Sequence, residues 1–268
     1  MPADSSDPLV SRLRAAGCVF AEDEARMLRS AARTPGELDA MVERRAAGLP
    51  LEHVVGWAEF GGLRVAVAPG VFVPRRRTEF LVRRAAALAP PRPVVVDLCC
   101  GSGALGAALI AALSAGRDGY ELHAADIEPA SVRCARRNVE PAGGRVYEGD
   151  LFDALPAGLR GRVDVLLCNV PYVPSGEIAL LPPEARDHEP AVALDGGADG
   201  LAVLRRVAAE ASGWLAPGGR LLFETSERQV PGALDAVARG GLVPEAARCA
   251  ELHATVVIGA KNFSPGSV

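Results

Sequence analysis

In VVVDLCCGSG, at residues 94–103, an apolar, strand-like segment leads directly into a glycine-rich turn. The run Val94 to Leu98 is typical of a buried strand, and Ala104 to Leu113 after the turn has helical periodicity. Glycines at such a junction let a ligand approach the backbone where a side chain would collide with it. The segment therefore predicts a nucleotide-type pocket at the end of a strand.

The chain after Pro93 alternates between strand-like and helix-like segments. This alternation predicts an α/β fold, in which a mostly parallel sheet carries helices on both faces. A long loop is expected at residues 173–200. The expected strands are 94–98, 121–125, 145–147, 163–168, 220–224, 245–249 and 255–258, and the expected helices are 104–113, 129–138 and 201–214.

The region before the alternating segments has a different pattern. Asp7 and Thr34 each precede a proline and are typical N-caps, which predicts short helices over the first fifty residues. Gly61-Gly62 between two short apolar runs predicts a β-hairpin. We therefore divide the chain into an N-terminal helical lobe with a hairpin, residues 1–85, and a catalytic domain, residues 86–268.

The composition restricts the partners and the compartment. The formal net charge of −4 argues against direct binding to nucleic acid, whose phosphates favour basic surfaces. Arg75-Arg76-Arg77 is a local basic cluster, which we interpret as a solvated face. No apolar run is long enough to cross a membrane, and residues 1–7 do not have the pattern of a signal peptide. The sequence therefore predicts a soluble cytoplasmic protein that does not bind membranes.

The six cysteines are scattered, and only Cys99 and Cys100 are close in sequence. Adjacent cysteines rarely share a disulfide or a zinc ion, and no CxxC pair or His cluster accompanies them. We therefore expect free thiols and no metal site.

Carboxylates lie at or just after the ends of three expected strands. Asp97 would repel a pyrophosphate but could accept hydrogen bonds from a cationic amino-acid moiety, or it could simply cap the next helix. Asp126 can accept the two hydroxyls of a ribose, and Asp150 can accept an adenine amino group with Leu151 packed on the ring. S-adenosylmethionine carries a ribose, an ammonium group and a sulfonium but no phosphate. These residues therefore favour it over a dinucleotide as the cofactor.

Asn169-Val170-Pro171-Tyr172 follows the buried strand 163–168, at a position where open α/β sheets bind ligands. Carboxamide and adenine amino nitrogens are planar and poor nucleophiles, so transfer to them depends on orientation. The Asn169 side-chain oxygen and the Val170 carbonyl can accept both N–H hydrogens of such a group, and Tyr172 can stack on it. No strong base is needed, because the proton leaves after the nitrogen has become cationic. The four residues therefore predict a catalytic loop for group transfer to nitrogen.

The chain resembles the protein-(glutamine-N5) methyltransferases that modify peptide chain release factors, a family of class I S-adenosylmethionine-dependent methyltransferases. The resemblance extends over nearly the whole chain. The motifs that carry it are Pro50 to Gly56, Ala58-Glu59-Phe60, Pro69-Gly70-Val71, Val73-Pro74-Arg75, Thr78-Glu79, Asp97-Leu98, Gly101-Ser102-Gly103, Asp126, Asn169, Pro171-Tyr172, His188-Glu189-Pro190 and Asp199-Gly200-Leu201.

The resemblance implies a fold and a role for individual residues. It implies a Rossmann-like, mostly parallel sheet with an antiparallel last strand, and an N-terminal lobe that grips the release factor. The loop from Asn169 to Tyr172 would hold the glutamine amide of a Gly-Gly-Gln tripeptide. The cofactor-binding residues predicted from the residue chemistry and the resemblance together are Asp97, Cys99, Cys100, Gly101, Ser102, Gly103, Asp126, Asp150, Leu151 and Asn169.

Three departures from the family pattern mark a divergent member. Val170 replaces the first proline of Asn-Pro-Pro-Tyr, although a residue before Pro171 is itself held extended. Arg75-Arg76-Arg77-Thr78-Glu79 replaces Arg-Pro-Glu-Thr-Glu, which reverses one charge. Cys99-Cys100 replaces a glycine and a small polar residue. A different protein substrate is therefore an open alternative.

Three other functions also remain open on the sequence. A nucleic-acid methyltransferase acting on adenine or cytosine amino groups would share the loop chemistry, but the acidic balance and the N-terminal lobe argue against it. A cofactor-binding protein without turnover would share the glycine turn. An NAD-dependent dehydrogenase would share the GxGxxG pattern of residues 101–106.

Overall fold

A computed structural model of the chain describes residues 7–114 and 119–263. It contains a seven-stranded sheet in the order β5-β4-β3-β6-β7-β9-β8. Neighbouring strands from β5 to β7 are parallel, and β9 runs antiparallel to both β7 and β8, which confirms the predicted sheet with its antiparallel last strand. The strands are β3 (Val94–Leu98), β4 (Glu121–Asp126), β5 (Arg145–Glu148), β6 (Val163–Cys168), β7 (Leu215–Glu224), β8 (Val243–Cys249) and β9 (Ala254–Ala260).

The register of the central strands brings three of the predicted loops to one edge of the sheet. Leu98 of β3 pairs with Ala125 of β4 and with Cys168 of β6, and Cys168 pairs in turn with Phe223 of β7. Because the strands are parallel, the residues that follow these positions leave the sheet on the same side. In open α/β sheets this carboxyl edge is where ligands bind.

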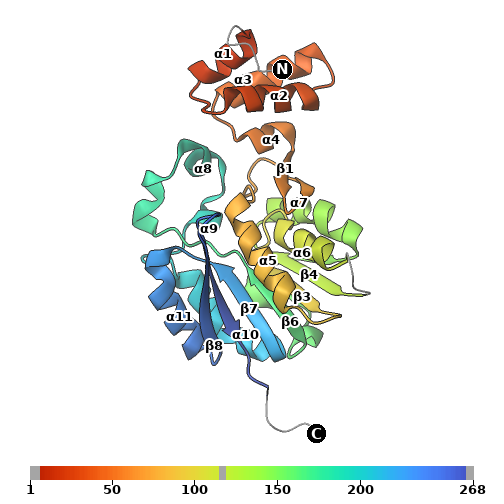
Figure 1. Cartoon of the computed structure of the whole chain (residues 1–268), viewed down its shortest axis with the longest axis vertical. Helices are drawn as coiled ribbons and strands as arrows, with labels where there is room; N and C mark the ends of the chain where they lie inside the picture. The colour runs from red at the N-terminus through yellow and green to blue at the C-terminus, as the bar shows by residue number, and fades with distance from the viewer. Residues whose placement is uncertain (1–6, 115–118, 264–268) are drawn as a thin grey trace.

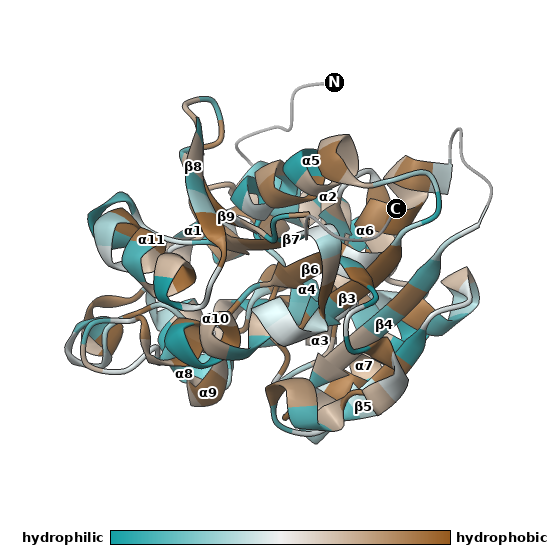
Figure 2. Ribbon diagram, turned by 90° about the horizontal axis from the view of Figure 1, so that it is seen from below, coloured by the Kyte–Doolittle hydropathy of each residue, from teal (hydrophilic) through white to brown (hydrophobic). Residues whose placement is uncertain are grey.

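Helices cover both faces of the sheet (Figures 1 and 2). Successive residues of β3 point to opposite faces, so Val95 packs in the cluster beneath α5, α6 and α7, while Val96 packs in the cluster beneath α10 and α11. Both valines are fully buried, which accounts for the continuous apolar run in the sequence. The helices are α5 (Glu79–Leu88), α6 (Ala104–Ser114), α7 (Pro129–Val139), α10 (Ala202–Trp214) and α11 (Val230–Arg239).

Four N-terminal helices form a hydrophobic core of their own, in which Leu13, Leu28 and Val42 are buried. The predicted caps are confirmed, because the Asp7 carboxylate accepts from the backbone N–H of Leu9 and the Thr34 hydroxyl accepts from that of Glu37. These helices lie at one end of the molecule (Figure 1). They are α1 (Pro8–Ala15), α2 (Ala21–Ala31), α3 (Pro35–Ala46) and α4 (Leu51–Val55).

The predicted hairpin, β1 (Trp57–Phe60) and β2 (Leu63–Ala66), packs against the catalytic sheet and its helices rather than against the N-terminal core. The Asn138 carboxamide of α7 fastens it there. Its oxygen accepts from the Ala66 N–H at 2.8 Å, and its nitrogen donates to the Ser102 carbonyl at 2.8 Å. One side chain thus joins the hairpin to the glycine-rich turn.

The structure differs from the sequence expectations in three segments. The expected loop 173–200 contains α8 (Pro183–His188) and α9 (Ala191–Leu194), each preceded by a proline, a residue whose fixed φ suits a helix start. Helix α11 was not predicted, since Pro231 and Gly232 weaken its helical pattern. Strand β7 begins at Leu215 instead of residue 220, because the Pro217-Gly218-Gly219 turn forms a bulge within the strand.

The remaining elements are short 3₁₀ turns. No helix in the described ranges combines the length and the apolar character needed to cross a membrane. The absence of a signal peptide was predicted from residues 1–7, of which 1–6 lie outside the described residues. The 3₁₀ turns are η1 (Arg76–Thr78), η2 (Glu140–Ala142), η3 (Leu151–Ala154), η4 (Ala157–Leu159), η5 (Ser175–Leu180) and η6 (Glu227–Gln229).

Candidate active site

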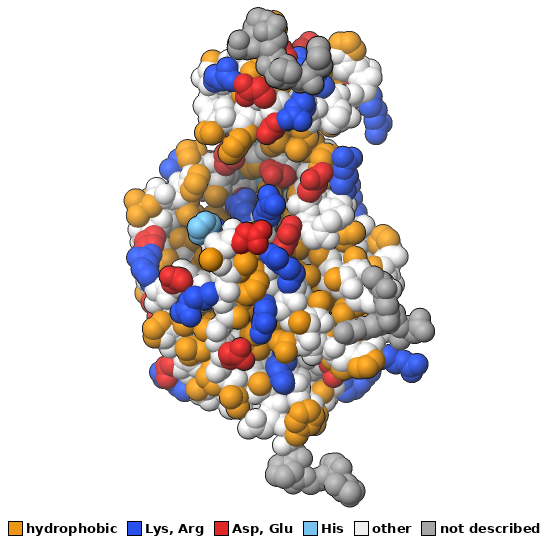
Figure 3. Space-filling model, in the orientation of Figure 1, with side chains coloured by type: hydrophobic (Ala, Val, Ile, Leu, Met, Phe, Trp, Pro, Cys, Tyr) orange, Lys and Arg blue, Asp and Glu red, His pale blue; other side chains and the backbone are white. Residues whose placement is uncertain are grey.

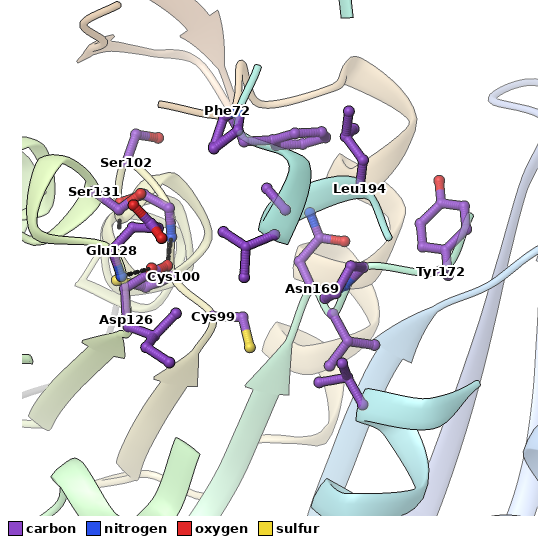
Figure 4. Close-up of a pocket in the computed structure, with 18 of the residues that line it drawn as sticks. Phe72, Cys99, Cys100, Ser102, Asp126, Glu128, Ser131, Asn169, Tyr172 and Leu194 are labelled. Carbon is purple, nitrogen blue, oxygen red and sulfur yellow. Dashed lines mark hydrogen bonds between the residues drawn. The ribbon is translucent and has the colours of Figure 1, made fainter. Parts of the chain in front are cut away.

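A cavity of about 510 Å³ opens at the carboxyl edge of the sheet. In Figure 4, Ser102 and Asp126 lie on one side of it, Asn169 and Tyr172 lie on the other, and Cys99 lies between them. Asp97 and Gly103 are the predicted site residues that do not line the cavity. Those that line it are Cys99, Cys100, Gly101, Ser102, Asp126, Asp150, Leu151, Asn169, Val170, Pro171 and Tyr172.

The glycine-rich turn is held by the strand beside it. The Gly101 N–H donates to Asp126 Oδ2 at 2.8 Å, and the Cys100 N–H donates to the Ala125 carbonyl at 3.1 Å. Asp126 Oδ1 accepts from the Glu128 N–H at 2.9 Å, so both carboxylate oxygens are oriented. Burial raises the pKa of Asp126, although its backbone hydrogen bonds oppose the shift. The predicted ribose acceptor is thus fixed at the cavity wall.

Cys99 has a φ of +52°, a left-handed conformation that favours glycine. The family pattern has a glycine here, so this departure leaves the conformation in place at the cost of some backbone strain. Gly103 also has a positive φ, and a Cβ on it would lie 2.7 Å from Val139 Cγ2. Gly103 therefore allows the turn to pack against α7 and does not face the cavity.

Asp97 is completely buried behind the turn. Its Oδ2 accepts from the Gly106 N–H at 2.9 Å, which is the helix-capping contact considered as the alternative role. Its Oδ1 has no hydrogen-bond partner in the described ranges, and burial raises the pKa of Asp97 to about 8. Its contact with a cofactor therefore stays a prediction.

Asp150 and Leu151 line the cavity after β5. Asp150 Oδ2 accepts from Arg206 Nη2 at 2.6 Å, a contact with α10 that sequence reasoning missed. Leu151 has a φ of +48° and is buried in the cluster beneath α10. The pair thus combines a half-buried carboxylate with an adjacent apolar surface.

The loop after β6 presents an unengaged carboxamide. Figure 4 shows the Asn169 side chain projecting into the cavity from the end of the strand, and it makes no hydrogen bond with any described residue. Val170 is only 3% exposed and packs in the cluster beneath α10 and α11. The Val170 side chain is thus packed into the core beside Pro171, at the position where the family pattern has another proline.

Tyr172 is anchored by two charged residues from distant parts of the chain. Its hydroxyl accepts from Arg77 Nη2 at 2.5 Å and donates to Glu224 Oε1 at 2.9 Å. Arg77 Nε donates to the same carboxylate oxygen at 2.8 Å. Burial and the nearby Glu224 raise the pKa of Tyr172 to about 12, so the hydroxyl stays protonated.

The interpretation of Arg75 to Arg77 as a solvated face was wrong for Arg75 and incomplete for Arg77, whose side chain is 47% exposed but pairs with a buried carboxylate. Arg75 Nη2 donates to both oxygens of Glu189, at 2.7 and 2.8 Å, and the Glu189 side chain is fully buried. Arg77 pairs with the equally buried Glu224. Arg75 and Arg77 pair with buried carboxylates and line the cavity, although Arg77 is also partly exposed to solvent; Arg76 is exposed and does not line the cavity.

Sequence reasoning missed Glu224, Gln229 and Arg206. Glu224 ends a buried strand, as Asp97 and Asp126 do, so the rule that found those carboxylates could have found it. Gln229 donates to the Tyr172 carbonyl at 2.8 Å from the turn before α11. No local pattern indicates this contact, because the two residues are far apart in sequence.

Comparison with known proteins identifies the family. The profile of the methyltransferase small domain matches residues 62–180. A release factor glutamine methyltransferase of Mycolicibacterium smegmatis is 44% identical over 197 residues, which cover 71% of this chain and 68% of that protein. A 4-amino-L-phenylalanine/4-methylamino-L-phenylalanine methyltransferase of Streptomyces pristinaespiralis is 37% identical and covers 73% of this chain and 72% of its own.

Solved structures support the fold. A 16S rRNA N2 G1207 methyltransferase of T. thermophilus, solved with AdoMet and guanosine, has a TM-score of 0.54 at 21% identity, covering 77% of this chain and 50% of that one. At this identity the likeness concerns the sheet and its helices only. The identity and coverage of the curated relatives go further, and the chain belongs to the release factor glutamine methyltransferase family.

Proposed function

We propose that the protein transfers a methyl group from S-adenosylmethionine to the side-chain amide nitrogen (N5) of a glutamine in a protein such as a peptide chain release factor. The observation that carries this proposal is the Asn169 carboxamide, which projects into the cavity without a hydrogen-bond partner among the described residues. An unengaged amide oxygen at this place is a ready acceptor for the N–H of another amide.

The cavity residues fit the proposed cofactor. Gly101, with a φ of +54°, leaves the turn open to close approach, and Asp126 offers oriented carboxylate oxygens to a ribose. Leu151 offers an apolar surface to an adenine ring beside the Asp150 carboxylate. Asp97 lies behind the turn and does not line the cavity, so its unpartnered Oδ1 adds no support to the cofactor assignment. Bound S-adenosylmethionine supplies an electrophilic methyl group carried on a sulfonium.

The role of the acceptor loop is to orient the substrate amide nitrogen. Asn169 Oδ1 and the Val170 carbonyl accept the two N–H hydrogens of the glutamine amide, which fixes the direction of the nitrogen lone pair. Tyr172 lies against the flat amide while its hydroxyl stays bonded to Glu224. Such positioning contributes roughly 7–11 kcal/mol when the geometry is near attack. No general base is required, since the proton is lost from an already cationic nitrogen.

Residues 1–85 are the proposed recognition lobe, and residues 86–268 are the proposed cofactor-binding domain. The separate core of α1 to α4 and the firm attachment of the hairpin support this division of roles, because they allow a protein to be gripped at a fixed distance from the cavity. Basic and acidic side chains are interspersed on the face drawn in Figure 3, which suits a protein better than a polyphosphate partner.

A free aromatic amine is a second candidate acceptor. The relative from S. pristinaespiralis is named for methylation of 4-amino-L-phenylalanine. Phe72, Leu181 and Leu194 line the cavity and give it an apolar surface that suits an aromatic ring. The two acceptors differ in size and in attachment, so they are easily separated by experiment.

The test is incubation of the protein with tritiated S-adenosylmethionine and either a release factor or 4-aminophenylalanine, followed by mapping of the label. Label on the Gly-Gly-Gln glutamine supports the proposal. Label on the free amine alone would show that the acceptor is an aromatic amine and not a protein glutamine. Absence of label in both, with the cofactor bound, would contradict both of these acceptors.

A further inference from the structure

The acceptor loop of this chain has only one residue whose backbone is locked by a ring. Pro171 fixes its own φ and restricts Val170, whereas the family pattern has prolines at both positions. The carbonyl of Val170 is one of the two acceptors in the proposed mechanism. A rotation of its peptide plane would misdirect that acceptor, so other contacts must hold the end of the loop.

Those contacts come from four separate elements, η6, α9, η1 and β7. The Tyr172 carbonyl accepts from Gln229 Nε2, and the Val173 N–H donates to the Leu194 carbonyl at 3.0 Å. The Tyr172 hydroxyl is bonded on both sides, accepting from Arg77 and donating to Glu224. Because Arg77 also donates to Glu224, the three side chains form a closed set of hydrogen bonds.

The buried carboxylate of Glu224 needs the positive charge of Arg77. The Glu224 side chain is 4% exposed, and a carboxylate buried to this extent requires a cation or several donors. Arg77 is that cation, at the position where the family pattern has a glutamate. A hydroxyl that is both donor and acceptor between two fixed charges has its rotation restricted, and the ring and the loop that carry it are restricted with it.

We infer that Arg77 and Glu224 are positioning residues that hold the acceptor loop through the Tyr172 hydroxyl, an inference that rests on the proposed function. In the proposed mechanism neither contacts the substrate amide, although Arg77 lines the cavity. They act on the direction of the Val170 carbonyl and of the Tyr172 ring, and the Arg77–Glu224 pair stiffens the loop in place of the missing proline.

A double-mutant cycle tests this inference. The variants are Arg77→Met, Tyr172→Phe and their combination, and kcat, KM for the acceptor and Kd for S-adenosylmethionine are measured for each. Each single change lowers kcat about tenfold, the loss expected for one charge-assisted hydrogen bond. The combined variant loses no more than either single variant, because both remove the same tether, and Kd is unchanged. Arg76→Met, at the exposed neighbour, is the matched control and keeps the parent's kcat.

Multiplied losses of about a hundredfold in the combined variant would overturn the inference, because Arg77 and the hydroxyl would then act independently. An unchanged kcat in both single variants would also overturn it. If Arg77→Met does not fold, Arg77→Met with Glu224→Gln removes both charges and replaces it in the cycle.

Hydrogen exchange gives a readout that does not depend on turnover. The peptide spanning residues 169–175 exchanges faster in Arg77→Met and Tyr172→Phe than in the parent or in Arg76→Met. Equal exchange in all four proteins would contradict the inference even if no acceptor is methylated. If the four proteins show the expected differences in exchange but the parent methylates no acceptor, the result counts against the proposed function and not against this inference.

Discussion

The two sides of the cavity are held in different ways. On the cofactor side, the turn after β3 is bonded to residues at the end of the adjacent strand β4, through Gly101 to Asp126 and Cys100 to Ala125. On the acceptor side, Glu224 likewise ends the neighbouring strand, β7, but the loop after β6 is also bonded to segments outside the sheet, through Arg77, Gln229 and Leu194.

This difference bears on the three departures of the chain from the family pattern. The cofactor side is built from neighbouring strands whose positions the sheet determines, so its geometry survives the replacement of a glycine by Cys99. The proposed acceptor side also uses segments outside the sheet, so under the proposed function a substitution in one of them leaves cofactor binding undisturbed. Val170 and Arg77, two of the three departures from the family pattern, both fall on this side.

The largest expected effect separates the two sides. Asn169→Ala removes one acceptor of the substrate amide and lowers kcat by about a hundredfold or more, since a misplaced reacting group costs about that much. The Kd for S-adenosylmethionine, measured by calorimetry, stays within error of the parent. Asn262→Ala, at an exposed site, is the control. A comparable loss of cofactor affinity in Asn169→Ala would show that the two sides are not independent.

The converse change is Asp126→Ala. It removes the proposed ribose acceptor and the partner of the Gly101 N–H, so Kd for S-adenosylmethionine rises roughly 10- to 100-fold. At saturating cofactor, kcat falls much less. The exposed Asp39→Ala serves as the control for the loss of a carboxylate. Equal dissociation constants for Asp126→Ala and the parent would reject the ribose contact.

The same division explains what the sequence could predict. Hydrophobic periodicity located most strands, and the rule that ligands bind at strand ends brought Asp126 and Asn169 together. Side chains that join distant segments leave no local pattern. Arg77 was therefore interpreted as part of a solvated face, and its pairing with Glu224 was not predicted. Asp97 was located correctly as buried at a strand end, but the sequence could not tell whether its oxygens face the cavity or α6.

Two glycines with similar backbones test how tightly the cofactor side is packed. Gly103 has a φ of +76° and Gly143 a φ of +74°, but a Cβ would meet Val139 Cγ2 at 2.7 Å at the first and nothing within 4 Å at the second. Gly143→Ala therefore costs about 1 kcal/mol from the backbone alone. Gly103→Ala costs about 2–4 kcal/mol, because the clash adds to the strain. Urea unfolding measures both, and equal costs would mean that the turn can shift.

The last prediction concerns the dependence of stability on pH that Asp97 confers. Burial raises its pKa from 3.8 to about 8, so between these values the folded protein keeps a proton that the unfolded chain has lost. The free energy of unfolding of the parent therefore falls as pH rises toward 8, by at most about 1.4 kcal/mol per pH unit, and levels off above it. Asp97→Asn lacks this slope, and unfolding of both proteins at several pH values checks it. Parallel pH curves would show that the Asp97 carboxylate is ionised in the folded state.

A crystal structure of the protein with S-adenosylhomocysteine and a Gly-Gly-Gln peptide tests the division between the two sides most directly. The expected result places the glutamine amide nitrogen within hydrogen-bond distance, roughly 2.7–3.2 Å, of both Asn169 Oδ1 and the Val170 carbonyl, with the ribose on Asp126. A structure in which the Asn169 carboxamide points away from the peptide, or in which the peptide amide contacts the β3 turn instead, would contradict it.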